Sequence, residues 1–444
     1  MTFPASYMQG RLYHSVNSHV SGEFIAIVWR LTGRLDRSAL QIALDGLVRR
    51  HEALRTTLRE EAGQLIQSVQ PNPWIDGLSA VTSLAHGERD RVSAALLASG
   101  ICEPVDLTRG PTVRARVLQI DELEHVLCLA VHHAFCDGWS EQVISRDLWA
   151  LYDAAITHES ALIPTDLMQM GDYAVWEQSA AQPDREAYWR RALEQSQTTI
   201  PFPRRAAIGS GALRRPSLTT LEPLSPASTR ELFRCAQAER ASRGMALAAV
   251  SLAALSTFSA ARGLFAILDA NRGRRELRDT VGCLFDMRPL PISLSDAMSL
   301  REMLRYVRDA WRGAYAHQLP LVALTHLQDQ AATQSPAGFD AAMNLITPLT
   351  IAPLEVSLAG GLDVRLEATP TDWPRPHAEF SYAHDEITFE LTLEGDGRLN
   401  GGIESNAALH LPADIAALAS RFSVIAERGP LQASSSVARL VRSP

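Results

Sequence analysis

The stretch EHVLCLAVHHAFCDGWS, residues 124–140, ends an apolar run with two adjacent histidines, His132 and His133. Residues 124–131 are apolar on both faces of the predicted strand, which is typical of a central strand covered on each side. Such a strand delivers both histidines from the interior to the end of a sheet. A helix is predicted to begin just beyond Gly138, and α/β sheets usually bind ligands where a strand end meets a helix N-terminus.

The segments before and after this strand alternate between strand and helix patterns. Asp36 is placed to cap a helix, whose buried face is predicted to consist of Leu40, Ile42, Ala43, Leu44 and Leu47. The other strands predicted in the first half cover 23–33, 112–120 and a hairpin of 54–60 with 64–70, and the helices cover 35–52, 88–99 and 140–156.

The second half mixes helices and strands in similar proportion. Its predicted helices cover 226–244, 245–260, 298–317 and 412–426, and its predicted strands cover 264–270, 341–347 and a hairpin over 386–405. A length of 444 residues favours two lobes over one core. We therefore predict an α/β protein with an N-terminal lobe over 1–165, a connection over 166–215, a C-terminal lobe over 216–432 and a flexible tail over 433–444.

Charge, cysteine spacing and hydropathy exclude several classes of protein. The net charge of -8 disfavours nucleic acid as a partner. Five cysteines, none in a CxxC pair, suggest reduced thiols in a cytoplasmic protein. No signal peptide is recognised, and the longest apolar stretch, 243–260, is interrupted by serines and indicates a core helix. We therefore expect neither nucleic acid nor a membrane among the partners.

The chain contains no lysine, so all 42 residues counted as lysine or arginine are arginine. This excludes a Walker A phosphate-binding lysine and a Schiff-base lysine for pyridoxal phosphate. Codon bias in a GC-rich genome explains the absence without a functional reason.

The histidine pair and the Asp-Gly that follows it suit acyl transfer. A neutral imidazole takes a proton from an attacking amine or hydroxyl near neutral pH, and Gly138 lets the backbone approach a reacting centre. The alternative is that His132 and His133 only end a strand and Asp137 only caps a helix. Adjacent strand residues point to opposite faces, so the two histidines are not expected to share a metal ion.

Seven segments of the chain match, in order, a set of motifs that occur together in one family. They are ASYMQGRLY (5–13), RRHEALRTTL (49–58), HHAFCDGWS (132–140), GDYAVWEQ (171–178), VGCLFDMRPLPI (281–292), AHQLPLVAL (316–324) and GFDAAMNL (338–345). The first three are similar to SxxQxRL, RHExLRTxF and HHxxxDGxS. On these motifs the chain resembles the condensation domains of non-ribosomal peptide synthetases, which belong to the HHxxxDG acyltransferase superfamily, over nearly its whole length.

The resemblance implies two chloramphenicol-acetyltransferase-like lobes that form a V-shaped pseudo-dimer with a central tunnel. It implies that His133 is the catalytic histidine, as a base or as a positioning residue, and that Gly138 shapes the loop beside it. His132 and Asp137 are expected to be structural, with Asp137 paired to Arg272 from the second half.

Other motif and channel positions are occupied by Gln9, Arg11, Arg55, Trp139, Ser140 and Asp286. The resemblance implies that Gln9 and Arg55 are structural links and that Trp139 and Ser140 start the helix. Asp286 stands where the family usually has asparagine, which leaves the identity of the acceptor open but not the reaction class.

A family member of this kind transfers an acyl or aminoacyl thioester from the phosphopantetheine arm of an acyl or peptidyl carrier protein. The acceptor is a small-molecule amine or alcohol, or a second carrier protein, and the product is an amide or an ester. We expect no bound cofactor besides the tethered substrate. The chain holds no adenylation motif and no GGxS carrier serine, and Met1 shortly precedes the first motif, which favours a free-standing enzyme that releases a finished chain.

Two alternatives stay open within the superfamily. Inert docking or recruitment modules typically lose a motif histidine, whereas both are present here. Epimerisation domains usually read DGxSWR, whereas residues 137–142 read DGWSEQ. Condensation is therefore the favoured interpretation.

Overall fold

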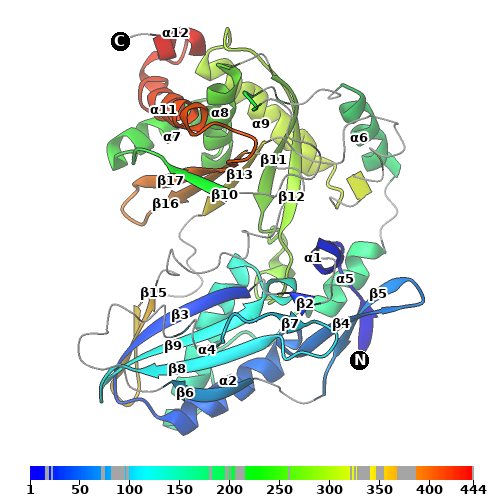
Figure 1. Ribbon diagram of the computed structural model, residues 1–444, viewed down its shortest axis with the longest axis vertical. Helices are drawn as coiled ribbons and strands as arrows, with labels where there is room; N and C mark the ends of the chain where they lie inside the picture. The colour runs from blue at the N-terminus through cyan, green and yellow to red at the C-terminus, as the bar shows by residue number, and fades with distance from the viewer. Residues whose placement is uncertain are drawn as a thin grey trace. The chain divides into compact units, whose positions relative to one another are not determined.

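The computed structural model describes residues 1–15, 20–21, 24–71, 76–81, 96, 100–179, 183–195, 200, 202–205, 216–258, 261–320, 323–324, 327, 341–346, 355–367 and 387–442. The chain divides into two compact units, and Figure 1 labels their helices and strands. Unit 1 contains Met1–Ala180, Ala270–Phe285 and Leu349–Phe380, and unit 2 contains Ala181–Asp269, Asp286–Pro348 and Ser381–Pro444. The units differ from the predicted lobes because two segments of the second half belong to unit 1.

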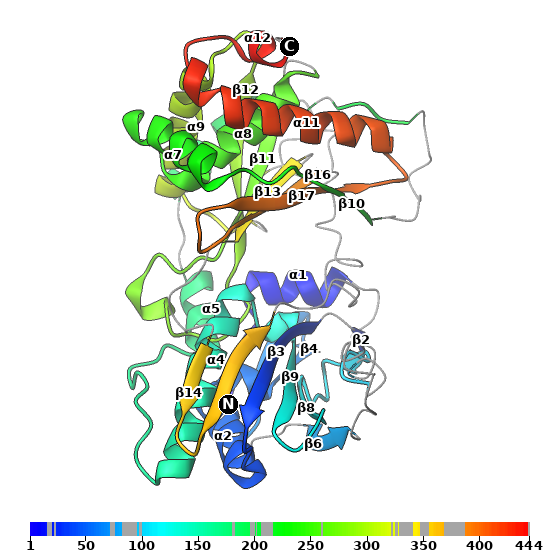
Figure 2. The same ribbon diagram turned by 90° about the vertical axis from the view of Figure 1, so that its left-hand side faces the viewer.

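Unit 1 is built on a six-stranded mixed sheet with the order β14-β15-β3-β9-β8-β6 (Figure 2). Its strands are Glu355–Leu358 (β14), Leu362–Glu367 (β15), Phe24–Gly33 (β3), Glu124–His132 (β9), Val113–Gln119 (β8) and Asp76–Val81 (β6). The predicted central strand is confirmed, since β9 pairs with β3 on one side and β8 on the other and is fully buried over residues 127–131. The sequence pattern predicts neither β14 nor β15, which join this sheet where β15 pairs with β3.

Helices α2 (Arg37–Arg50) and α4 (Gly138–Thr157) pack against each other in unit 1. Asp36 caps α2 as predicted, because its Oδ1 accepts hydrogen bonds of 2.8 and 2.9 Å from two backbone N–H groups of the first turn. The predicted burial of Ile42 is wrong, since this side chain is 62% exposed. Ile42 lies out of phase with the buried stripe of α2, which consists of Ala39, Leu40, Ala43, Leu44, Leu47 and Val48.

The structure also describes smaller elements of unit 1. They are helices α1 (Tyr7–Ser15) and α5 (Met170–Gln178), the predicted hairpin of β4 (Thr56–Glu61) and β5 (Gln64–Val69), β1 (Thr2–Pro4) beside β5, and the pair β2 (Val20–Ser21) and β7 (Val105–Asp106). The helix predicted over 88–99 lies outside the described residues, apart from residue 96.

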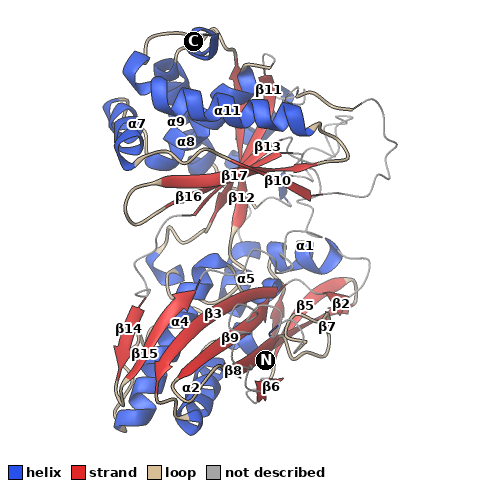
Figure 3. Cartoon of the chain, turned by 60° about the vertical axis from the view of Figure 1, so that its left-hand side comes forward, coloured by secondary structure: helices blue, strands red, loops and turns tan. Residues whose placement is uncertain are grey.

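Unit 2 contains a second six-stranded sheet, with the order β10-β17-β16-β13-β11-β12. Its strands are Pro216–Thr220 (β10), Leu399–Asn406 (β17), Ile387–Leu393 (β16), Ala341–Ile346 (β13), Ala261–Asp269 (β11) and Asp286–Leu294 (β12). Its helices are Pro183–Gln195 (α6), Pro226–Ala238 (α7), Arg243–Ser256 (α8), Leu300–Ala316 (α9), Pro412–Arg428 (α11) and Val437–Arg442 (α12). Helices α7, α8, α9 and α11 gather beside one face of the sheet (Figure 3). The predicted mixture of helices and strands in the second half is confirmed.

Two features of unit 2 differ from the sequence prediction. β12 forms despite Pro289 and Pro291, because it is the edge strand of the sheet, where a missing N–H donor is tolerated. The flexible tail predicted over 433–444 is wrong for residues 437–442, which form α12 and bury Val437 and Leu440. In the described part of the chain, no helix has the length and apolar character needed to cross a membrane.

Candidate active site

One short turn of unit 1 joins the end of β9 to the start of α4. β9 ends at His132, the 3-10 helix η3 (His133–Phe135) follows, and α4 begins at Gly138. Both imidazoles are buried, with His132 0% and His133 4% exposed. The turn therefore places two histidines with different surroundings beside a helix N-terminus.

The ring of His133 is held in one tautomer by the backbone. Its Nδ1 lies 2.8 Å from the carbonyl oxygen of Cys136. A carbonyl oxygen only accepts hydrogen bonds, so Nδ1 carries the proton and Nε2 carries the lone pair of the neutral ring. Burial lowers the pKa of His133, although its backbone hydrogen bonds oppose the shift. At neutral pH the side chain is therefore a neutral imidazole with a basic Nε2.

His132 has the opposite tautomer. Its Nδ1 accepts a hydrogen bond of 3.2 Å from the backbone N–H of Ala134, so its proton is on Nε2. Its ring stands edge-to-face against Phe24 at 5.5 Å, and burial lowers its pKa to about 3. This ring caps η3 and fills the core. In the described part of the chain, no group of three or more His, Cys, Asp or Glu side chains could hold a metal ion.

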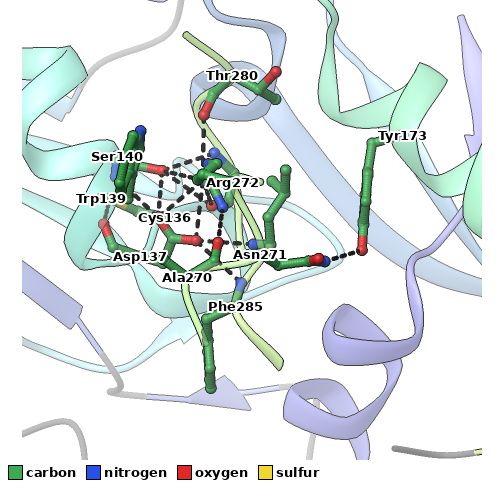
Figure 4. A network of polar contacts seen from close by, with 12 residues as sticks. Cys136, Asp137, Trp139, Ser140, Tyr173, Ala270, Asn271, Arg272, Thr280 and Phe285 are labelled. Atoms are coloured by element: carbon green, nitrogen blue, oxygen red, sulfur yellow. Dashed lines mark hydrogen bonds and ion pairs between the residues drawn. The ribbon is translucent and has the colours of Figure 1, made fainter. Parts of the chain in front are cut away.

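Asp137 is the N-cap of α4 and the centre of a polar network (Figure 4). Its Oδ1 accepts hydrogen bonds from the backbone N–H and hydroxyl of Ser140 at 2.9 and 2.8 Å and from Nη2 of Arg272 at 3.1 Å. Its Oδ2 accepts hydrogen bonds from the backbone N–H groups of Leu284 and Phe285 at 3.0 and 3.2 Å. These donors fill the acceptor capacity of a carboxylate, so Asp137 is poorly suited to take a proton from a substrate.

Arg272 belongs to the segment 270–285 that unit 1 takes from the second half of the sequence. The ion pair expected from the resemblance is present, and its Arg272 and Asp137 side chains are 1% and 3% exposed. The guanidinium also donates to the carbonyl oxygens of Ala270 at 2.6 Å and Thr280 at 3.3 Å. The pair therefore holds both ends of this segment against the N-terminus of α4.

The first residues of α4 differ in their exposure. Gly138 is exposed, and a Cβ atom added there would meet nothing within 4 Å. The protein itself therefore does not require a glycine here for packing, and the space in front of the helix is open. Trp139 donates from Nε1 to the carbonyl oxygen of Arg278 at 2.8 Å, and Ser140 binds the backbone N–H of Gly282 at 3.1 Å.

The other residues selected from the motifs lie outside this turn. Gln9 is fully buried and accepts the backbone N–H of Ser6 at 2.9 Å, which caps α1. Arg55 donates to the carbonyl oxygen of Gln70 and to Glu52 at 3.3 Å, so it ties a short 3-10 turn to the end of β5. Arg11 is half-buried on α1.

Asp286 belongs to unit 2, where it is the first residue of β12. Its Oδ2 pairs with Nη1 of Arg288 at 3.3 Å, and Arg288 also pairs with Asp269 at 3.1 Å. The carboxylate that replaces the family's usual asparagine is therefore compensated by a buried guanidinium.

The sequence reasoning missed one residue beside His133 and one in the first turn of α4. The ring of Phe285 lies against the His133 imidazole, with 5.2 Å between ring centroids. Glu141, in the first turn of α4, is half-buried, and burial raises its pKa to about 7. Phe285 lies within the recognised segment 281–292 and Glu141 directly follows the segment 132–140, but neither residue type marks a site by itself.

A model of the family described as Condensation domain matches residues 1–428. The chain is 28% identical over 439 residues to chondramide synthase cmdD of Chondromyces crocatus, covering 95% of this chain and 11% of that protein. It is 30% identical over 408 residues to phosphinothricin tripeptide synthetase PhsC of Streptomyces viridochromogenes, covering 87% of this chain and 35% of that protein. The chain thus spans only a small part of the length of such relatives.

Among solved structures, the X-domain from teicoplanin biosynthesis superposes with a TM-score of 0.80 and 22% identity, covering 98% of this chain and 96% of that one. The same X-domain has also been solved in a complex with OxyB. At this identity the likeness shows the fold, and it agrees with the two mixed sheets described above.

Proposed function

The chain belongs to the condensation domain family, and on that premise we propose that it transfers an acyl or aminoacyl group from a phosphopantetheine thioester on a carrier protein to an amine or hydroxyl acceptor. One observation carries the proposal. The Cys136 carbonyl holds the Nδ1 proton of His133, and burial keeps the ring neutral, so that Nε2 is the base.

The reaction follows from this geometry. The nitrogen or oxygen of the acceptor attacks the thioester carbonyl carbon, and its proton passes to Nε2 of His133 as the new C–N or C–O bond forms. The C–S bond then breaks, and the departing sulfur takes the proton back from His133 as the pantetheine thiol. Partial positive charge at the N-terminus of α4, beside Gly138, favours the developing oxyanion.

His133 has a second possible role, as a residue that positions the acceptor without taking its proton. The two roles differ in their dependence on proton transfer. A base makes the rate depend on the acceptor's acidity, because its proton moves in the transition state. If His133 only positions the acceptor, replacing His133 leaves the dependence of the rate on the acidity of the acceptor unchanged.

We further propose that the carrier-bound donor is supplied from outside these 444 residues, in which no adenylation motif or carrier serine is recognised. Acceptors from solution, with release of a finished amide or ester, are favoured over a second carrier protein. That the chain acts as a free-standing enzyme stays a prediction.

Intact-mass spectrometry tests the reaction class. Acyl-loaded carrier proteins are incubated with a panel of small amines and alcohols, with wild-type protein, His133→Ala and the control His14→Ala, whose imidazole is 62% exposed. We expect loss of the acyl group and a condensed product with the wild type and the control only. An unchanged acyl-carrier mass across the panel with wild-type protein would contradict transfer to soluble acceptors.

A recruitment module is the second candidate, because the X-domain with the same fold has been solved in a complex with OxyB. An inert module predicts no transfer to any soluble or carrier-bound acceptor, together with stable binding of a partner enzyme in size-exclusion chromatography.

A further inference from the structure

One short turn of unit 1 carries three exposed arginines. The 3-10 helix η4 (Arg275–Leu277) is flanked by Arg274 and Arg278, and Arg274, Arg275 and Arg278 are all exposed. The backbone N–H groups of Leu277 and Arg278 donate to the carbonyl oxygens of Arg274 and Arg275, each at 3.2 Å, which closes the turn. Residues three and four apart in such a turn lie on the same side, so Arg278 is a neighbour of the other two. We call these three residues the arginine turn.

A tryptophan joins the arginine turn to the start of α4. Nε1 of Trp139 donates to the carbonyl oxygen of Arg278 at 2.8 Å, and Trp139 directly follows Gly138. Gly138 is exposed, and a Cβ atom added there would meet nothing within 4 Å. The arginine turn therefore lies beside the exposed N-terminus of α4, which the turn containing His133 joins to β9.

The positive charge of the arginine turn has little compensation. The next residue, Asp279, already pairs with Nη1 of Arg146 at 2.5 Å. Among the residues that the structure describes, no carboxylate forms an ion pair with any of the three arginines. Glu276 is an exposed anion within the turn, so an excess of two positive charges remains, although the net charge of the whole chain is -8. Such an excess favours an anionic ligand at this place.

The geometry of Arg274 favours a phosphate among the possible anions. Its guanidinium carbon lies 4.6 Å from the centre of the ring of Trp176, a residue of α5 that is 41% exposed. An arginine that covers an aromatic ring can still donate from the N–H groups at its edge. A planar guanidinium can bind two oxygens of a phosphate through parallel N–H bonds. The arginine turn is therefore suited to hold a phosphate group at the surface.

The donor of the proposed reaction carries such a group. A phosphopantetheine thioester has a phosphate at the end where the arm joins the carrier protein and the reacting thioester at the other end. We propose that the arginine turn binds the phosphate of the donor's phosphopantetheine arm, while the thioester end reaches His133 past Gly138. This inference rests on the proposed function, since it names the surface that receives the proposed donor.

Transfer kinetics with two soluble donors test the role of the arginine turn. The donors are an acyl-phosphopantetheine and the matching acyl-pantetheine, which differ only in the phosphate. The triple variant combines Arg274→Gln, Arg275→Gln and Arg278→Gln, and Arg34→Gln is the control. Arg34 is exposed and lies beyond the end of β3 that is remote from His132, since β3 and β9 are antiparallel.

We expect the wild type and Arg34→Gln to have a KM for acyl-phosphopantetheine about tenfold lower than for acyl-pantetheine, because several exposed charges attract the phosphate. The triple variant should lose this difference with kcat unchanged, since the phosphate takes no part in bond formation. Added salt should reduce the difference in the wild type. Transfer by the wild type with equal KM for both donors, or a difference that the triple variant keeps, would overturn the inference and leave the proposed function intact.

A binding measurement separates the inference from the proposed function, because it needs no turnover. Ligand-observed NMR titration of the whole chain compares phosphopantetheine with pantetheine. Tighter binding of phosphopantetheine by the wild type, lost in the triple variant, would support the arginine turn even if no acyl transfer were detected. Equal binding of the two ligands by the wild type, or the same preference in the triple variant, would overturn it.

Discussion

The tautomer of His133 decides what this side chain would contribute to the proposed reaction. In the proposed mechanism the neutral ring is the reactive form, and burial lowers its pKa below the ordinary value of about 6.5. With a hydroxyl acceptor, which does not titrate in this range, the fraction of neutral ring, and with it kcat/KM, therefore rises with pH through a value below about 6.5 and is level at neutral pH. A pH profile of kcat/KM measured on a carrier-bound substrate checks this expectation.

Glu141 provides the control for that profile, because burial raises its pKa to about 7. If Glu141 had to lose a proton for activity, the acidic limb would fall near pH 7 and would disappear in Glu141→Gln. We expect Glu141→Gln to keep the acidic limb of the wild type. A limb at or above pH 7 that Glu141→Gln removes would contradict the role given to His133.

Asp137 is predicted to act on folding rather than on chemistry. Asp137→Ala leaves Arg272 as a buried cation and removes the acceptor of five hydrogen-bond donors, so we expect a loss of about 3–5 kcal/mol in the free energy of unfolding. Glu61→Ala is the control, since the Arg59–Glu61 pair is 41% and 53% exposed and its loss should cost about 0–1 kcal/mol. Urea unfolding measures both. A stable Asp137→Ala protein that is only slow in transfer would show that the carboxylate has a chemical role.

At the level of single residues, the sequence identifies His133 and Asp137 because their motif is short and local. Arg272 is expected as the partner of Asp137 only through the resemblance, since nothing in the local sequence around either residue indicates the other. Phe285 is missed although it lies within the segment 281–292, because an aromatic residue is more often part of the core than of a site.

Among the elements, the pairing of β15 with β3 has a direct test. Gly33 ends β3 with a φ of +118°, and an added Cβ would lie 2.1 Å from the carbonyl oxygen of Gly361, next to β15. Gly33→Ala should therefore lower the free energy of unfolding by about 2 kcal/mol or more. Gly10→Ala is the matched control within α1, where a Cβ meets nothing within 4 Å and alanine should stabilise the helix by about 1 kcal/mol. Equal urea midpoints for the two variants would contradict this pairing.

Elements with a strong local pattern are predicted well, as α2, β9 and α4 show. Their caps, apolar spacing and burial are all set by neighbouring residues. β12 is missed because its two prolines resemble a loop, and only its place at the sheet edge makes them tolerable. β14 and β15 are missed because short alternating strands are ambiguous until their partner is known.

At the scale of the whole molecule, the order of the sequence does not reveal which segments form one unit. Unit 1 takes residues 270–285 and 349–380 from the second half of the chain. The first segment provides Arg272 to the Asp137 network, and the second provides β14 and β15 to the sheet. Composition alone cannot assign these segments, because their contacts are made with residues far away in the sequence.

The rate of acyl transfer by the whole chain is the sharpest test of the role proposed for His133. The measurement follows, by intact mass at neutral pH, the loss of the acyl group from a loaded carrier protein with wild-type protein and His133→Ala, whose urea midpoints are compared first. A general base predicts a rate about 100- to 10,000-fold lower in the variant. Transfer by a folded His133→Ala protein at the wild-type rate would contradict that role.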